Sequence, residues 1–148
     1  MDIVKATPRP SRPRVDAVPL LFDALSDARI VAAQHTPLIV LFSRADCSFC
    51  HEVRTNYLAP LGRLSAHPLI VREAITDRPH RVTWSGAEQM SHAQLATKME
   101  VRFYPTVHFI DEHLQPIIKP LLGAGMAGFY DAYLTQHIQE ATRILRRI

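Results

Sequence analysis

Short apolar runs and helically spaced apolar positions divide the first half of the chain into elements. Residues 38–42 (LIVLF) follow Pro37 without a polar interruption, which is typical of a strand buried on both faces of a sheet. Residues 69–75 are a second strand candidate. Before these runs, apolar positions within residues 19–34 recur with helical spacing, and Pro19 suits the first position of a helix. The pattern predicts one helix followed by two buried strands.

The segment between those two strands is predicted to be helical. After Cys50, three apolar or aromatic residues share one helical face until Pro60 kinks or restarts the helix. Residues 76–86, after the second strand, are polar and are predicted to be irregular. We expect Trp84 and Met90, which flank the end of this loop, to pack in the core, and a lip around a substrate groove is the alternative for both.

The second half of the chain predicts a helix, a hairpin and a closing helix. Residues 91–94 (SHAQ) form a capping-box pattern, which predicts a helix from there to about residue 99. Residues 106–110 are rich in β-forming residues, and residues 117–122 return as a partner strand after a polar turn. The last helix is predicted over residues 127–146, and its buried stripe consists of Tyr130, Tyr133, Leu134, His137, Ile138, Ala141, Ile144 and Leu145. This order predicts an α/β fold with a mixed four-stranded sheet flanked by helices on both faces.

Composition and charge change this picture mainly at the N-terminus. Residues 1–18 hold three prolines among arginines, resist helix and sheet, and are predicted to form an extended tail before one domain over residues 19–148.

The chain has 148 residues, 47 % of them hydrophobic, and a net charge of +3, as expected for one globular domain. The arginines at 143, 146 and 147 suit a helix end, so we expect no nucleic-acid partner. No apolar run is long enough for a membrane span, and no secretory signal is visible.

The motif that carries chemistry is a pair of cysteines at the predicted junction of strand and helix. Cys47 and Cys50 enclose Ser48 and Phe49 where the first apolar run gives way to a helical segment. The unpaired N–H groups and the positive dipole of a helix N-terminus favour thiolate over thiol at Cys47. Lowering a thiol pKa from about 8.5 to about 6.5 raises the thiolate fraction at pH 7 from roughly 3 % to roughly 75 %. Cys50, one turn further into the helix, is placed to resolve a mixed disulfide, so the motif predicts thiol–disulfide exchange.

Three other uses of the two cysteines remain open from the residues alone. A structural disulfide is one, although a bridge that closes so small a loop stabilises by only about 2 kcal/mol. A zinc site needs two further ligands, and the eight histidines are scattered, so we expect neither a metal nor a bound cofactor. Cys47, Cys50 and His51 also fit the attachment pattern of c-type haem, although small c-type cytochromes are mainly helical. Otherwise His51 is an early-helix residue that faces solvent, or one that modestly influences Cys47.

A second motif lies directly before the third predicted strand. Residues 103–106 read FYPT, and the bond before Pro105, taken alone, would be expected to be trans. With the dithiol after an apolar strand, the kinked helix, the hairpin and the closing helix, this motif resembles the thioredoxin superfamily over about residues 19–147. The resemblance implies a thioredoxin-like fold and a cis proline that faces the dithiol, with Cys47 as nucleophile and Cys50 as resolving thiol. It also implies substrate-positioning roles for Tyr104, Pro105, Ser48 and Phe49.

The chain further resembles one periplasmic branch of the superfamily, the SoxW type, which is linked to sulfur oxidation. The residues that carry this resemblance are 56–61, 91–106 and 128–134. That resemblance implies a reductase with protein thiols or disulfides as substrates and an upstream electron donor as a second partner. It also implies a periplasmic location, and we expect a monomer. Within redox chemistry, an oxidase or isomerase is the alternative. Outside it, the alternatives are a c-type haem electron carrier that uses Cys47, Cys50 and His51, and a thioredoxin-like binding module without redox activity.

Two positions depart from the pattern of cytosolic thioredoxins. Asp46 replaces the tryptophan that precedes their first cysteine, and we expect it to cap the following helix or, if close, to oppose thiolate formation at Cys47. Leu41 stands where those proteins carry a buried acid that relays the proton of the resolving thiol. We therefore expect Glu73, on the second strand, or a water to act as the base for Cys50.

Overall fold

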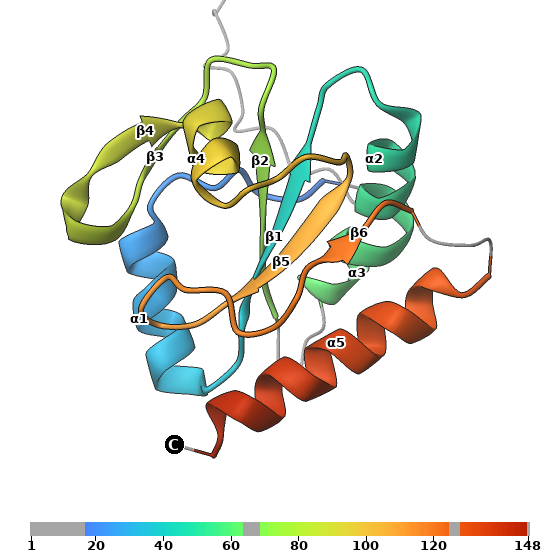
Figure 1. Ribbon diagram of the computed structural model, residues 1–148. Helices are drawn as coiled ribbons and strands as arrows, with labels where there is room; N and C mark the ends of the chain where they lie inside the picture. Colours follow the sequence, from blue (N-terminus) through green and yellow to red (C-terminus); the bar gives the residue numbers. More distant parts are fainter. Residues whose placement is uncertain (1–16, 64–68, 125–127, 148) are drawn as a thin grey trace, which may run out of the picture.

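A four-stranded mixed sheet forms the centre of this computed structural model, which describes residues 17–63, 69–124 and 128–147 (Figure 1). The strands lie in the order β2-β1-β5-β6. β1 (Leu38–Ser43) pairs in parallel with β2 (Ile70–Ile75) and antiparallel with β5 (Thr106–Ile110), and β5 pairs antiparallel with β6 (Leu121–Leu122). The mixed four-stranded sheet expected from the sequence is therefore confirmed.

Helices cover both faces of this sheet. α1 (Ala24–Gln34) and α4 (His92–Lys98) pack on one face, and α2 (Ser48–Val53) and α5 (Tyr130–Leu145) pack on the other (Figure 1). α2 continues through a π-helical segment, Arg54–Leu58, into the short helix α3 (Ala59–Leu61), which has Pro60 in its first turn. The predicted interruption near Pro60 is thus present, and the change of helical type absorbs it.

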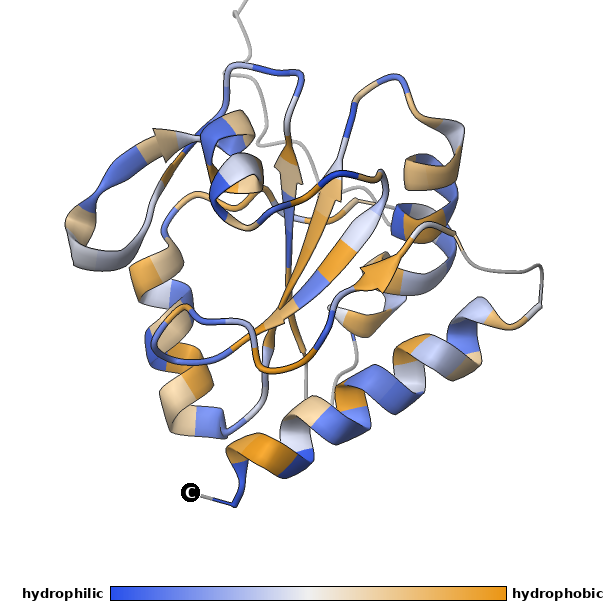
Figure 2. Cartoon of the chain, in the orientation of Figure 1, coloured by the Kyte–Doolittle hydropathy of each residue, from blue (hydrophilic) through white to orange (hydrophobic). Residues whose placement is uncertain are grey.

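β1 is buried along its whole length because each of its faces meets a separate core. Leu38, Val40 and Phe42 pack with residues of α1 and α4. Ile39 and Leu41 point the other way and pack with residues of α2, α3 and α5. Figure 2 shows the resulting hydrophobic band through the centre of the sheet. Burial on both faces explains why this strand is an uninterrupted apolar run rather than an alternating one.

The first helix is shorter than the sequence predicted. It begins at Ala24 rather than at Pro19, and Asp23 is its N-cap, with a side chain that accepts a backbone hydrogen bond from the first turn. The chain before the cap is extended along β2. The Leu21 N–H donates to the Glu73 carbonyl, and the Glu73 N–H donates to the Pro19 carbonyl, each at 2.9 Å. These bonds use the backbone groups on the outer edge of β2, so pairing with a distant strand overrides the helical spacing.

Part of the segment that was expected to be irregular forms a second, two-stranded sheet. β3 (Arg81–Thr83) and β4 (Gln89–Ser91) pair antiparallel around a short 3₁₀ turn, Ser85–Ala87, so the prediction of an irregular loop was wrong there. Trp84 and Met90 are 1 % and 5 % exposed and pack in the core beneath α1 and α4. Core packing of both residues is confirmed, and neither forms a lip around a groove.

The hairpin strand and the last helix are also shorter than predicted. Residues 117–122 were expected to form one strand, but only Leu121–Leu122 do so. Pro120, directly before them, has no N–H to donate to a ladder, and Pro116 makes only an isolated bridge with Ile110. α5 buries four residues of its predicted stripe, whereas Tyr133 is 47 % exposed and does not belong to it. Residues 125–127, which include the predicted start of the helix, and residues 1–16 of the predicted tail lie outside the described residues. None of the described helices is long and apolar enough to cross a membrane.

Candidate active site

Cys47 and Cys50 form a disulfide where β1 leads into α2. Their Cα atoms are 5.2 Å apart. Cys47 is the N-cap of α2, and its Sγ accepts a hydrogen bond from the Cys50 N–H at 3.2 Å. The expectation that Asp46 caps this helix is therefore wrong, because the extended backbone and the sulfur of Cys47 already occupy the cap position. The Cys47 sulfur thus lies at the positive end of the helix dipole.

The two cysteines differ in their access to solvent. Cys50 is fully buried, whereas Cys47 is partly exposed. Ser48 and Phe49, between them, are exposed, and 60 % of Phe49 is accessible. His51 is exposed as well, as expected for an early-helix residue that faces solvent. An incoming reactant can therefore reach Cys47 but not Cys50.

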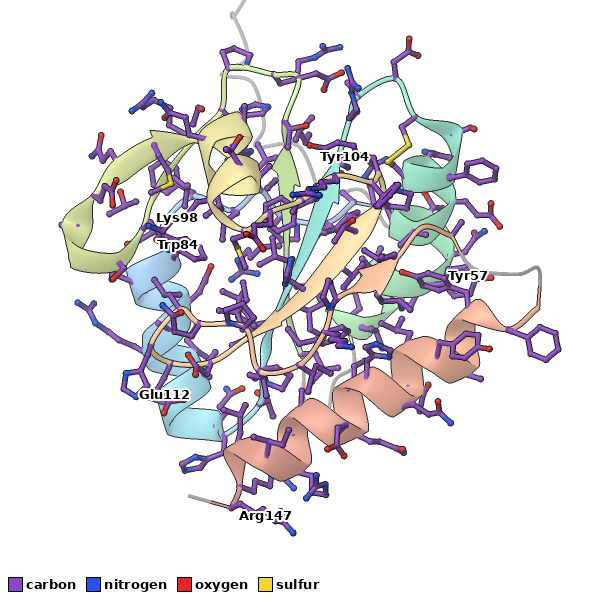
Figure 3. The ribbon with its side chains drawn as sticks, viewed as in Figure 1. Tyr57, Trp84, Lys98, Tyr104, Glu112 and Arg147 are labelled. Atoms are coloured by element: carbon purple, nitrogen blue, oxygen red, sulfur yellow. A yellow bond between two sulfur atoms is a disulfide. The ribbon has the colours of Figure 1, made fainter. Side chains whose placement is uncertain are left out.

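Tyr104 and Pro105 lie next to the loop that carries the dithiol. The Tyr104–Pro105 peptide bond is cis. Thr106, the next residue, pairs with Phe42 near the end of β1. The Arg44 guanidinium carbon lies 5.8 Å from the centre of the Tyr104 ring, so this ring packs against the loop between β1 and Cys47. Figure 3 shows the labelled Tyr104 side chain and the disulfide at the same end of the sheet.

A buried carboxylate lies one strand away from the position where the thioredoxin resemblance places it. Glu73 on β2 is the register partner of Leu41 on β1, and only 3 % of it is exposed. The Ser43 hydroxyl donates to its Oε2 at 2.5 Å. Arg54 donates to both carboxylate oxygens, from Nε to Oε1 at 2.8 Å and from Nη2 to Oε2 at 2.5 Å. The carboxylate is therefore held against the helical segment that follows Cys50.

The sequence had identified Glu73 as a candidate base but had not identified Arg54 as its partner. A glutamate inside an otherwise apolar strand is a sequence signal that a cationic partner is needed, because an unpaired buried charge is costly. Arg54 carries a matching signal, since it follows Cys50 by one helical turn and so faces the sheet beneath the dithiol.

Two other uses of the cysteines concern bound groups. A c-type haem would take both sulfurs in thioether bonds, so haem attachment and the disulfide are alternative states of the same pair. Within residues 17–63, 69–124 and 128–147, no three His, Cys, Asp or Glu side chains are arranged to hold a metal ion.

Solved structures with a similar backbone come from thioredoxins and a related oxidoreductase. Thioredoxin of Fasciola hepatica matches with a TM-score of 0.56 at 15 % identity, over 83 % of this chain and 98 % of that chain. Mitochondrial thioredoxin 3 of Saccharomyces cerevisiae, in its oxidised form, matches with a TM-score of 0.55 at 15 % identity, over 85 % of this chain and 97 % of that chain. The DsbH oxidoreductase matches with a TM-score of 0.54 at 14 % identity, over 93 % of each chain. At such low identity these likenesses support the fold alone.

Sequence comparison supplies the family. None of the curated protein sequences matches the chain significantly. The family profile of the thioredoxin-like domain, in contrast, matches residues 25–134, which span every strand of the central sheet and the start of α5. Given this match, the mixed sheet and the disulfide at the junction of β1 and α2, the chain belongs to the family of thioredoxin-like domains.

Proposed function

We propose that this protein is a thiol–disulfide oxidoreductase that reduces disulfides in partner proteins. The observation that carries this proposal is the asymmetry of the dithiol. Cys47 is accessible at the positive end of α2, where its sulfur accepts a backbone hydrogen bond, and Cys50 is buried behind it. A hydrogen bond and a helix dipole that favour the thiolate make Cys47 the nucleophile. Burial restricts Cys50 to reaction with the sulfur of Cys47.

The reaction conserves electrons through two exchanges. In the reduced protein, the Cys47 thiolate attacks one sulfur of the partner disulfide, and the other partner sulfur leaves as a thiolate. Cys50 then loses its proton and attacks the Cys47 sulfur, which forms the intramolecular disulfide and releases the second partner thiolate. Two electrons have passed to the partner, and its two thiolates take up two protons. A dithiol donor restores the reduced protein by the reverse exchanges.

Glu73 is proposed as the group that takes the Cys50 proton, directly or through a water. Its support is geometric: Glu73 is a buried carboxylate on the face of the sheet beneath α2, held by Ser43 and by Arg54 of the segment that continues α2. It thereby replaces the acid that Leu41 cannot supply.

Four residues around the dithiol are proposed to position the partner protein: Tyr104, Pro105, Ser48 and Phe49. Tyr104 and Pro105 border the loop before Cys47, so an extended segment of the partner can lie alongside their backbone. The exposed Phe49 ring offers an apolar contact at the dithiol itself. A protein substrate can use such a surface, whereas a small disulfide is too small to cover it.

The finer assignment is to a periplasmic reductase of the SoxW type, which acts as a monomer with an upstream dithiol donor. The sequence similarity of residues 56–61 and 128–134 to that branch supports it. Whether the protein acts as a reductase or as an oxidase is tested by the reduction potential of the Cys47–Cys50 pair, measured against glutathione or dithiothreitol buffers. We expect a value near the roughly −270 mV of thioredoxin, and a value near the roughly −120 mV of strong oxidants would show an oxidase instead.

The proposed roles of the two thiols are tested with single variants. Cys47→Ser should abolish the reduction of insulin, whereas Cys50→Ser should keep the first attack and accumulate mixed disulfides with partner proteins. Alkylation of each remaining thiol across pH should show that Cys47 reacts as a thiolate at neutral pH and that Cys50 does not. If Cys50 reacts faster, or if both variants retain full activity, the chain is better described as a binding module with a structural disulfide.

A further inference from the structure

A cavity of about 600 Å³ lies against β5, on the sheet face that α5 does not cover. Three parts of the chain border it: residues 99–103 before β5, the alternate residues Thr106 and His108 of β5, and residues 116–122 around β6. Figure 1 shows these two connections approaching β5 from its two ends. The volume is in the range of sites that hold small organic ligands, and this cavity is partly open to solvent.

Most of the cavity wall is apolar. Val101, Ile117 and Leu122 contribute aliphatic side chains, and two prolines stiffen the segment at residues 116–120. Leu122 is 52 % exposed although it belongs to a strand. The hydrocarbon part of a ligand can therefore pack against apolar side chains of the wall and lose its contact with water.

His108 is the polar group at the base of this cavity. It is 5 % exposed, and its Nδ1 has no hydrogen-bond partner among the described residues. Thr106, beside it, is already engaged, because its hydroxyl donates to the Phe103 carbonyl at 2.5 Å. The Phe42 ring meets the imidazole edge-on, with ring centres 5.7 Å apart, and supplies no hydrogen bond.

Burial lowers the pKa of His108, so the ring is neutral at pH 7 and carries one donor and one acceptor nitrogen. Nδ1 is itself shielded from solvent, although the His108 ring borders the cavity, so the nitrogen that a ligand in the cavity can bond is Nε2.

The lining of the cavity carries more positive than negative charge. Arg102 belongs to the segment before β5 and Lys119 to the segment before β6, both are exposed, and Glu100 is the acidic residue of the lining. Neither cation forms an ion pair within residues 17–63, 69–124 and 128–147. Both are free to meet an anion.

We propose that this cavity binds a small organic carboxylate with an aromatic-sized apolar body, whose carboxylate lies between Arg102 and Lys119 and whose far end makes a hydrogen bond to His108. The apolar wall takes the body of the ligand. Phe103 and Thr106 of the lining flank Tyr104 and Pro105, so the cavity adjoins the proposed partner-binding surface, but the proposed ligand binding does not depend on the dithiol chemistry.

The test uses 4-hydroxyphenylacetate as probe and the complete oxidised chain. Titration followed by ¹H–¹⁵N NMR should give saturable shifts at residues 99–103, 106–108 and 116–122, with a Kd on the order of 1 mM for a ligand of this size. Phenylacetate, which lacks the hydroxyl, should bind about fivefold more weakly, the usual effect of one lost hydrogen bond. Tyramine, which carries an ammonium in place of the carboxylate, should give no saturable shifts.

Variants then assign the contacts. His108→Leu should weaken binding of 4-hydroxyphenylacetate about fivefold and remove its advantage over phenylacetate. Arg102→Gln combined with Lys119→Gln should weaken both acids alike. His113→Gln, an exposed histidine outside the lining, is the matched control and should leave both affinities unchanged.

Three results would overturn the proposal: no saturable shifts at these residues, equal affinity for tyramine and the two acids, or equal affinity of the native chain for the acids with and without the hydroxyl. The last comparison needs no variant, so it remains decisive if His108→Leu does not fold. Insulin reduction is not a readout of this site. A negative result in the ligand titration therefore leaves the proposed redox function intact. A negative result in the insulin assay likewise leaves the proposed ligand site intact.

Discussion

Acidification should destabilise the folded protein through two buried histidines, His92 and His108. His92 has no solvent exposure. Its Nδ1 accepts a hydrogen bond from the Ile75 N–H at 3.0 Å, and its Nε2 donates to the Leu21 carbonyl at 2.8 Å. Only the neutral ring fits these partners, because a protonated Nδ1 would face another N–H. Burial lowers the pKa of both histidines below the usual 6.5.

The sign of the effect follows from proton binding. As the pH falls below about 6.5, the unfolded chain binds protons at both histidines before the folded protein does, so stability is present above this pH and is lost below it. Over the step from pH 7.5 to pH 5.5, proton uptake by the unfolded chain changes the folding equilibrium by up to about tenfold for each histidine that stays neutral in the folded protein, or about 1 kcal/mol. Together the two rings should remove up to roughly 3 kcal/mol, a large part of the stability of an ordinary domain.

Urea unfolding at both pH values measures this loss. His92→Gln and His108→Leu each remove one titrating ring and should each recover about half of the loss on acidification. His113→Gln is the control, because its side chain is 78 % exposed, and it should show the full loss. Burial raises the pKa of Asp27, but this residue is common to all four proteins, so its contribution cancels in the comparison.

His92→Gln also lowers stability at pH 7.5, because one amide cannot reproduce both hydrogen bonds of the ring. The informative quantity is therefore the difference in free energy of unfolding between the two pH values for each protein. A wild-type chain that is equally stable at both, or variants that both retain the full loss, would refute the assignment of neutral buried rings.

Four further predictions concern the dithiol and its surroundings. Glu73→Gln should lower the free energy of unfolding by about 1 to 3 kcal/mol, since it leaves Arg54 partly buried without its counter-charge, whereas Glu140→Gln on the surface should leave the urea midpoint unchanged. The same Glu73→Gln variant should slow the release of mixed disulfides while the alkylation rate of the reduced nucleophile stays unchanged. Phe49→Ser should raise KM for insulin severalfold with little effect on a small aromatic disulfide. Phe22→Ser, at a ring that is also exposed but lies on the segment before α1, should change neither. Protein made with haem-attachment machinery should show no Soret band that survives denaturation, and such a band would overturn the oxidoreductase assignment.

Features that involve neighbouring residues were determined by the sequence alone. The buried run of β1 could be recognised because every residue from 38 to 42 is apolar. The capping box of α4 could be recognised because its two hydrogen bonds join residues three positions apart: Gln94 N–H donates to Ser91 Oγ at 3.0 Å, and Ser91 N–H donates to Gln94 Oε1 at 2.8 Å. The position of the cysteine pair could be recognised for the same reason, because the apolar run before it and the helical pattern after it are neighbours in the sequence.

Features that depend on distant residues were decided only by the tertiary structure. Helical spacing after Pro19 favoured a helix, yet the chain there is extended, because its backbone pairs with the edge of β2 about 50 residues later. Glu73 was recognised, but its ion pair with Arg54 required the register of β2 and the orientation of the helix after Cys50. The reason is the same in both cases. Local propensities differ by less than about 1 kcal/mol per residue, and a few long-range hydrogen bonds and buried contacts outweigh them.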